Sequence, residues 1–287
     1  MDSIYPTLAA YLSKYIFKNT ELSDLLTEYF EAYKRQKLSN KLEPDFLKKV
    51  DELALSREFN RLPTRNEIVD GVDRSDTYLY WLDALGVEYL SLIEALVQKR
   101  GLSIKVDIAR AELPTITPIN RDFYDNWEGN REKNSELDNT KHNSEGGYNF
   151  TNSELPIHLA KVLDIITEMI DQAATKLSLR QCKRFLIVSD HGASRLAVLR
   201  RKEEKYDTDT KGDYSGRCCK SFQPHDLPFV AEENGYLILA DYGRFKGSRA
   251  SNVEVHGGAS LEEVVVPIIE LSLKNRSITV KLVDDVV

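Results

Sequence analysis

The sequence predicts an α/β fold, with a mainly parallel central sheet sandwiched by helices and an N-terminal helical extension. The first observation behind this prediction is that short apolar runs alternate with longer amphipathic stretches beyond Gly71. The second is that one such run, residues 185–188, stops at Asp190-His191, as strands do when their carboxyl ends border a ligand site. The third is that apolar residues before Gly71 recur only at helical spacing, which predicts helices.

The individual elements follow from the same patterns. The expected strands are four apolar runs, at residues 77–82, 103–109, 185–188 and 236–240. The expected helices are three longer stretches, at residues 87–99, 155–176 and 261–269. Residues 126–151 are rich in Asn, Ser, Gly, Glu and Lys and predict a long polar loop. We therefore expect a helical extension over residues 1–70 and an α/β domain over residues 71–287.

Composition bounds the class of protein. The 287 residues, 41% of them hydrophobic and 30% charged, are ordinary for a globular protein. No apolar run approaches the roughly 18 residues that a membrane span needs, and Met1-Asp2-Ser3 is not the basic start of a secretory signal. We expect a cytoplasmic protein with no membrane partner. The net charge of −7 argues against broad nucleic-acid coating. The basic runs at residues 200–202, 217–220 and 244–249 are either a local basic rim or solvated faces, and we favour the solvated faces.

Cysteine usage agrees with this compartment. The three cysteines are an odd set, and the adjacent Cys218 and Cys219 cannot easily bridge to each other. A disulfide framework is therefore not expected.

Several polar residues fall where parallel strands are expected to end. Asp83 follows the run at residues 77–82 and is either a metal ligand or the N-cap of the next helix. Residues 113–120 carry Thr115 and Thr117 between prolines, which either hold a hydroxyl towards a site or form a plain loop. Glu154 and His158, four residues apart, are either two ligands of one metal or an exposed ion pair.

Histidines concentrate at the same positions. Of the five histidines, His158, His191 and His256 occupy expected strand ends or helix starts. Together with Asp83, Glu154 and Asp190 they provide three imidazoles and three carboxylates, which suits two zinc or manganese ions. The remaining histidines are interpreted as a solvated loop residue, His142, and a turn residue, His225.

The order of these motifs resembles the alkaline phosphatase superfamily. The motifs are Asp83, Thr117, the acid-x-x-x-His at 154–158, Ser-Asp-His-Gly at 189–192 and Val-His-Gly-Gly at 255–258. Within that superfamily, residues 256–267 are similar to the C-terminal signature of the PglZ domain family, which is found in bacterial phage-exclusion (BREX) systems. The resemblance covers about residues 76–270 and implies that residues 71–287 form an alkaline phosphatase-like, metal-dependent hydrolase domain. PglZ proteins are usually longer than this chain.

The resemblance also implies roles for particular residues. Thr117 matches the nucleophile. The ligands of one metal would be Asp83, Thr117, Asp190 and His191, and those of the other would be Glu154, His158 and His256. The family more often has Asp where Glu154 stands, which makes Asp164 an alternative ligand, and Thr115 is the second choice for the nucleophile. Three arginines are candidates for binding the phosphate, namely Arg121, Arg195 and Arg244.

These roles imply a phosphohydrolase of a phage-defence system. We expect hydrolysis of phosphate monoesters or diesters, nuclease-like activity included, with two divalent metal ions, zinc first and manganese second. The expected partners are a phosphate ester substrate, with nucleotides and nucleic acids among the candidates, and other phage-defence proteins. The alternative is an interaction subunit of a BREX-type complex with weak or no catalysis. Phosphomutase-like transfer is a third class, for which the chain lacks an evident substrate-enclosing insert. Glu262 and Glu263 are read as the first turn of a helix.

Overall fold

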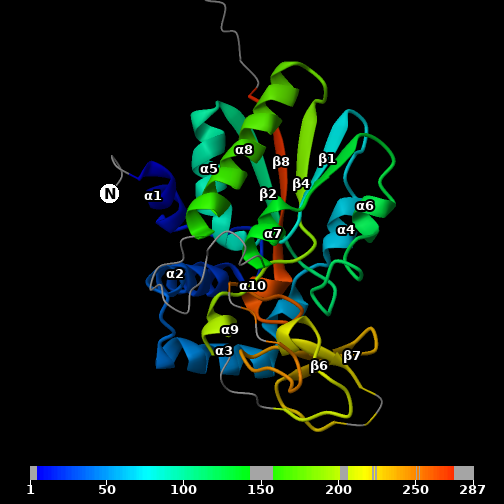
Figure 1. The fold of residues 1–287 in the computed structure, drawn as a ribbon. Helices are drawn as coiled ribbons and strands as arrows, with labels where there is room; N and C mark the ends of the chain where they lie inside the picture. Colours follow the sequence, from blue (N-terminus) through cyan, green and yellow to red (C-terminus); the bar gives the residue numbers. More distant parts are fainter. Residues whose placement is uncertain are drawn as a thin grey trace, which may run out of the picture.

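The computed structural model describes residues 5–142, 158–200, 206–221, 223, 225–249, 251 and 253–274. Its main feature is a five-stranded sheet in the order β2-β8-β4-β1-β3 (Figure 1). The strands are β1 (Thr77–Leu82), β2 (Leu102–Arg110), β3 (Arg131–Asn134), β4 (Arg184–Val188) and β8 (Val265–Leu273). The predicted strands at residues 77–82, 103–109 and 185–188 are thereby confirmed. The α/β class is confirmed as well.

The sheet is mixed, so the expectation of a mainly parallel sheet is wrong. β1 pairs in parallel with β3 and β4, whereas β8 lies antiparallel to both β4 and β2. The cause is the segment expected as a helix at residues 261–269. Only α10 (Leu261–Val264) is helical, and the chain continues directly into β8, because the β-branched residues around Pro267 favour a strand and the proline cannot continue a helix.

Helices cover both faces of the sheet. On one face lie α5 (Leu90–Lys99), which a 3₁₀ turn at Val87–Tyr89 precedes, and α8 (His158–Ser178). On the other lie α4 (Arg65–Asp70) and α6 (Asp122–Asp125). The alternation of side chains along β1 separates the two cores: Tyr80 belongs to the larger cluster, and Leu79 and Trp81 belong to the smaller one. The two predicted helices at residues 87–99 and 155–176 are confirmed within the described ranges.

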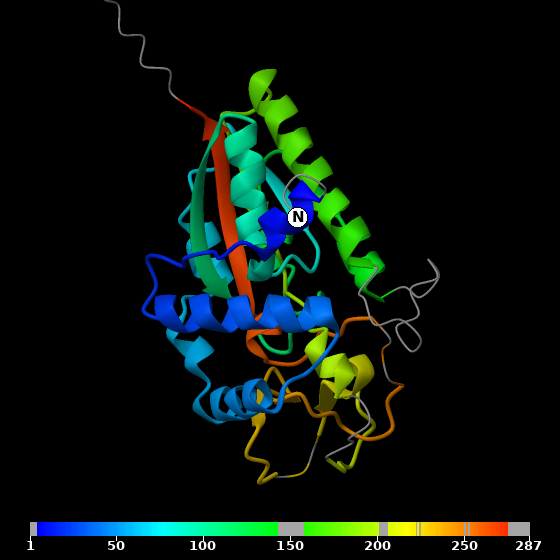
Figure 2. The same ribbon diagram turned by 90° about the vertical axis from the view of Figure 1, so that its left-hand side faces the viewer.

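The predicted N-terminal helices are also confirmed. They are α1 (Pro6–Leu12), α2 (Ser23–Ser39) and α3 (Pro44–Ser56), with a 3₁₀ turn at Glu58–Arg61. Figure 2 shows α2 lying across one end of the sheet, with α3 beyond it. Phe30 and Tyr33 of α2 share one buried cluster with Leu85 and Tyr89, which follow β1. The helical extension thus packs on the α/β part, and its boundary at residue 70 stays a prediction.

A second, smaller sheet lies beyond the carboxyl ends of β1 and β4 (Figure 1). It is antiparallel, in the order β5-β7-β6. Its strands are β5 (Cys218–Lys220), β6 (Val230–Glu233) and β7 (Tyr236–Leu239). The strand predicted at residues 236–240 therefore exists but belongs to this sheet. The three cysteines are free and buried.

The expected polar loop at residues 126–151 is wrong in its described part. Residues 131–134 form β3, and Glu136–His142 form α7. The rest of the expected loop lies outside the described residues. The remaining short elements are α9 (Leu196–Leu199) and a 3₁₀ turn at Tyr214–Gly216. Within the ranges that the structure describes, no helix combines the length and apolarity needed to cross a membrane.

Candidate functional site

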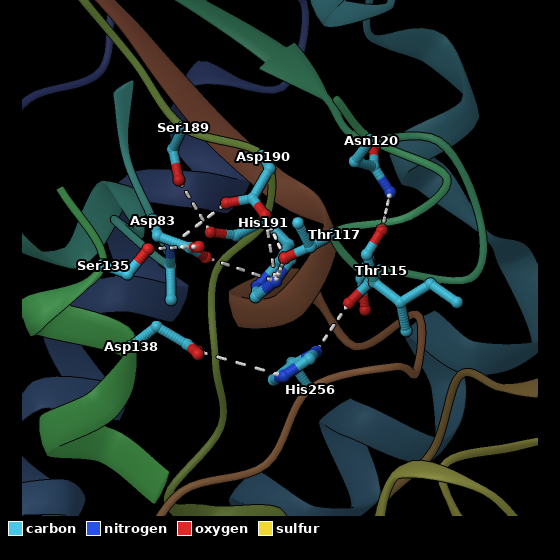
Figure 3. A network of polar contacts seen from close by, with 12 residues as sticks. Asp83, Thr115, Thr117, Asn120, Ser135, Asp138, Ser189, Asp190, His191 and His256 are labelled. Carbon is cyan, nitrogen blue, oxygen red and sulfur yellow. Dashed lines mark hydrogen bonds and ion pairs between the residues drawn. The ribbon is translucent and has the colours of Figure 1, made fainter. Parts of the chain in front are cut away.

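The first group of candidate ligands lies where β1 and β4 end. Asp83 directly follows β1, and Asp190 and His191 follow β4 two residues after its end. Because these strands are parallel neighbours, their carboxyl ends bring the three side chains together (Figure 3). One potential ligand atom from each lies within 4.8 Å of the others. The predicted association of Asp83, Asp190 and His191 is thus present.

The two carboxylate oxygens of Asp83 differ in their contacts. Its Oδ2 receives the Lys133 ammonium at 2.7 Å and the Ser135 hydroxyl at 3.3 Å. Its Oδ1 is buried without a hydrogen-bond partner among the described residues and lies 3.8 Å from His191 Nε2. Burial, followed by the nearby Asp190 carboxylate, raises the pKa of Asp83 to about 6. A cation at Oδ1 would give this buried oxygen a partner and would reduce the repulsion between the Asp83 and Asp190 carboxylates.

Asp190 connects this group to the candidate nucleophile. Its Oδ1 accepts the backbone N–H of Ala84, and its Oδ2 accepts the Thr117 hydroxyl at 2.7 Å. Thr117 Oγ1 also lies 3.5 Å from His191 Nε2. Burial opposes ionisation of Asp190, but His191 and the Thr117 hydrogen bond outweigh it and lower the pKa of Asp190. Thr117 is only partly buried, so its hydroxyl can face both the ligand group and an incoming molecule.

The loop that carries Thr117 is fixed by one amide. Asn120 Nδ2 donates to the carbonyl oxygens of Glu112, Pro114 and Ile116. Arg65 then donates to Asn120 Oδ1 and to the Asp190 carbonyl. The buried arginine therefore sets the distance between this loop and the end of β4.

Thr115, the second choice for the nucleophile, has a structural role. Its side chain is fully buried. Its hydroxyl donates to the Gly258 carbonyl at 2.7 Å and accepts the Gly257 N–H. The Thr115 carbonyl contacts His256 Nδ1 at 2.8 Å. Thr115 thus holds the His256 segment in place, and the choice of Thr115 as nucleophile is wrong because its oxygen is already engaged and enclosed.

A second group consists of Asp138, His191 and His256, which again offer ligand atoms within 4.8 Å of one another. Asp138 Oδ1 lies 3.9 Å from His256 Nε2 and 3.1 Å from His142 Nε2. The rings of His191 and His256 stack with centroids 4.0 Å apart, and the His142 ring lies 4.7 Å from that of His256. His142 was expected as a solvated residue of a loop. It is exposed, as expected, but it lies in α7 rather than in a loop, and α7 turns it towards Asp138 and His256.

The tautomers of two histidines follow from their backbone contacts. His191 Nδ1 lies 2.9 Å from the Gly192 carbonyl, and His256 Nδ1 lies 2.8 Å from the Thr115 carbonyl. A carbonyl only accepts, so each Nδ1 carries a proton and each Nε2 faces the acidic side chains. Burial, followed by His191 and His142, lowers the pKa of His256 to about 3. His256 is therefore a neutral imidazole, the form that binds metals.

Asp138 and His142 stabilise each other's charge. Burial opposes ionisation of both groups, but their mutual hydrogen bond dominates. It lowers the pKa of Asp138 and raises that of His142. Asp138 therefore remains a carboxylate, as a ligand of a divalent cation must be.

The acid-histidine pair expected at residues 154–158 does not occupy this position. Glu154 lies outside the described residues. His158 is fully buried, and its Nε2 contacts Glu254 Oε1 at 2.7 Å. Neither ligand group of the described chain contains His158, so the structure does not bring it to His256, and its predicted metal binding with Glu154 stays a prediction. The alternative Asp164 lies on the exposed side of α8. The same four-residue spacing in Asp138 and His142 was the signal that the sequence reading missed.

The three candidate arginines are held by other partners. Arg121 forms an exposed pair with Asp125 at 2.6 Å. Arg195 is buried and donates to Asn40 and to the Val253 carbonyl. Arg244 donates to the Ser248 carbonyl. Lys133 instead contacts a ligand carboxylate directly, that of Asp83.

Glu263 fixes the segment that carries His256. Its two oxygens accept from Arg217 Nε at 3.0 Å and Nη2 at 2.7 Å, and from the backbone N–H groups of Gly258 and Ser260. A Cβ on Gly258 would lie 2.4 Å from the Arg217 guanidinium, so only glycine fits there. The reading of Glu263 as part of the first turn of a helix is confirmed, since Ser260 and Glu263 form the capping box of α10.

We expect Arg217→Met to lower the free energy of unfolding by about 3–5 kcal/mol, because it leaves Glu263 as an unpaired buried charge. Urea unfolding of the two proteins measures the difference. Arg121→Met is the matched control, because its pair with Asp125 is exposed and screened by solvent, so its loss should change the stability far less. Equal losses in both variants would contradict the role of the buried pair.

We also expect the affinity of the first group for Mn²⁺ to rise about tenfold from pH 5 to pH 7, because a proton and a cation compete for the same carboxylate oxygens. With a pKa of about 6, Asp83 is mostly protonated below this range and mostly ionised above it. His256, with a pKa of about 3, stays neutral throughout. Titration with Mn²⁺ at each pH measures the affinity, and a value that stays constant would contradict the ligand role of Asp83.

Comparisons with protein-family models and with curated proteins found no match for this chain. The resemblance to the PglZ domain family therefore stays a prediction from the sequence motifs.

Proposed function

We propose that this protein is a metal-dependent phosphohydrolase in which Thr117 is the nucleophile. The observation that carries the proposal is the position of the Thr117 hydroxyl. It lies 2.7 Å from Asp190 Oδ2 and 3.5 Å from His191 Nε2, and His191 belongs to both ligand groups. A hydroxyl beside two groups of carboxylates and imidazoles is an arrangement that suits metal-assisted attack on phosphorus.

The residues of both groups fit divalent cations. Asp83, Asp190, His191 and the Thr117 oxygen would hold the first. Asp138 and His256 would hold the second, with His142 beside them in place of the expected Glu154 and His158. Mixed carboxylate and imidazole ligands suit zinc, which we propose first, and manganese. The buried, unpartnered Oδ1 of Asp83 supports the fit, since an uncompensated buried carboxylate oxygen is costly.

When bound, divalent cations would stabilise the ionised hydroxyl and the charge on the phosphoryl oxygens. The chain's own part is to aim the nucleophile. Asp190 accepts the Thr117 proton in its hydrogen bond and thereby directs an oxygen lone pair away from the protein. The Thr117 proton passes to Asp190 Oδ2 as the Thr117 O–P bond forms and the bond from phosphorus to the leaving oxygen breaks, and the leaving group takes a proton from solvent. Water then attacks phosphorus and leaves as part of the released phosphate, and the Thr117 oxygen regains the proton from Asp190.

The wider setting of the proposal comes from the motif resemblance. We propose action in a PglZ-type phage-defence system, with other defence proteins as partners and a phosphodiester or monoester, such as a nucleotide or nucleic acid, as the substrate. Lys133 supports an anionic substrate, because its ammonium is partly exposed and lies beside the ligand groups. The Lys133 ammonium also lies 3.7 Å from the centre of the Trp81 ring, which fixes its direction.

The test is hydrolysis of bis(4-nitrophenyl) phosphate and 4-nitrophenyl phosphate by the purified protein. The protein is first stripped with a chelator and then assayed alone or with added zinc or manganese. We expect turnover only after metal addition. Turnover that is insensitive to the chelator would contradict the proposal. Bound metal without turnover of either ester would instead favour the interaction subunit of a defence complex.

A further inference from the structure

We propose that Lys141, a fully buried lysine of α7, is a positioning residue that sets the relative placement of the two ligand groups. The inference rests on the proposed function. α7 lies at the end of the main sheet near α10 (Figure 1). Lys141 immediately precedes His142, but its own contacts reach the segments that carry Asp83 and His256.

The ammonium of Lys141 holds the turn after β1. It donates to the Ala84 carbonyl at 2.9 Å. Ala84 has a left-handed backbone, with φ of 64°, which costs energy for a residue with a Cβ. The N–H of the same residue donates to Asp190 Oδ1. The turn is therefore fixed on one side by Lys141 and on the other by Asp190, and it determines where Asp83 lies.

The backbone of Lys141 holds the second group. Its carbonyl accepts the N–H of Glu254 at 3.1 Å, and its ammonium lies 3.5 Å from Glu254 Oε2. Glu254 stands two residues before His256. The backbone of Lys141 thus connects the segment that carries His142 to the segment that carries His256. Its side chain connects these two segments to the turn that follows Asp83.

The Lys141 ammonium lies in a network of buried charged side chains. Glu254 also pairs with Lys37 at 2.7 Å and with His158, and Lys37 pairs with Glu88 at 2.9 Å. The side chains of these residues are at most 2% exposed. Buried ion networks contribute little net stability compared with apolar packing but impose a defined geometry. This network therefore suits a positioning role better than a purely stabilising one.

The test is equilibrium titration of the full chain with Mn²⁺, comparing the wild-type protein with Lys141→Met. The substitution keeps an unbranched side chain one atom shorter and removes the donor to the Ala84 carbonyl. We expect Mn²⁺ affinity to fall about 10- to 100-fold, the usual effect of losing a group that orients metal ligands. Wild-type affinity in Lys141→Met would overturn the inference.

Lys34→Met is the matched control. Lys34 is also a buried lysine, but its ammonium donates to the carbonyls of Tyr11 and Ser13 at 2.8 and 2.7 Å, away from the ligand segments. We expect this variant to keep wild-type Mn²⁺ affinity. An equal loss in Lys34→Met would show that removing any buried ammonium suffices, which also overturns the inference.

Two further comparisons keep the test decisive. If Lys141→Met does not fold, Lys141→Arg is the variant to test, because arginine keeps the positive charge but moves the hydrogen-bond donor. Reduced Mn²⁺ affinity in Lys141→Arg would support the inference. Unchanged Mn²⁺ affinity would overturn it. The titration is also independent of turnover. A wild-type protein that binds no Mn²⁺ would defeat the proposed function itself. Two bound ions in both the wild-type protein and Lys141→Met, with equal affinity, would defeat the positioning role alone.

Discussion

A Thr117→Val protein is expected to lose at least about a thousandfold in turnover while keeping its bound metal. Valine closely matches the shape of threonine but has no oxygen to attack phosphorus, and loss of a covalent nucleophile is among the largest single effects in catalysis. Of the proposed ligands of the first cation, the substitution removes only the Thr117 oxygen, and the two carboxylates of Asp83 and Asp190 and the imidazole of His191 remain. The measurement is the initial rate with bis(4-nitrophenyl) phosphate, alongside the metal content of the same sample.

Thr117→Ser is the matched control for this experiment. Serine keeps the hydroxyl that contacts Asp190 Oδ2 at 2.7 Å and removes only a methyl group. We expect most of the activity to remain. Full activity in Thr117→Val would contradict the covalent mechanism, and equal losses in the two variants would attribute the effect to packing of the loop.

His191→Ala is expected to reduce the metal content from two ions per chain to about one. The Nδ1 of His191 contacts the Gly192 carbonyl, so its Nε2, which faces Asp83, Asp190 and Thr117, is the ring nitrogen that can bind a cation. Metal sites that lose one of a few protein ligands usually lose most of their affinity. The measurement is the metal content after dialysis against a buffer with a fixed free zinc concentration.

Two more variants are compared with His191→Ala for their metal content, the ligand variant Asp83→Asn and the control His225→Ala. Asp83 belongs to the first group alone, so Asp83→Asn should keep the ion of the second group. His225 contacts Ser221 and lies outside both groups, so its substitution should leave the metal content unchanged. Two tightly bound ions in His191→Ala would contradict the role of His191 as a metal ligand.

The part of the site that the sequence could predict is the part built on strong, local patterns. The run at residues 185–188 ends at Asp190-His191, and Asp83 ends another apolar run. Parallel neighbours bring such ends together whatever the remaining topology. The prolines at 114 and 118 indicate a fixed loop after β2, but the choice of Thr117 within that loop came from the resemblance to the alkaline phosphatase superfamily.

Asp138 and His142 were missed because α7 is only 7 residues long. Helical periodicity needs a window of about 11 residues or more to show in a sequence, and the polar composition of this segment resembles a loop. The buried partner of His158 was equally hidden. Glu254 lies 96 residues further along the chain, so local spacing could not distinguish a buried ion pair from a metal ligand.

The topology of the main sheet was missed at one strand. A short, continuous apolar run such as that around Val265 and Ile269 is compatible with either a buried helix or a buried strand. The β-branched residues and Pro267 favour the strand. Because α10 leads straight into β8 without a crossover, β8 enters the sheet antiparallel to β4, which no local pattern could indicate.

The most direct measurement is mass spectrometry of protein that has been quenched with acid during turnover of bis(4-nitrophenyl) phosphate in the presence of zinc. The proposed mechanism predicts a 4-nitrophenylphosphoryl adduct on the peptide that contains Thr117, absent from chelated protein and from Thr117→Val. Rapid turnover with an unmodified Thr117 peptide, together with an active Thr117→Val protein, would contradict it.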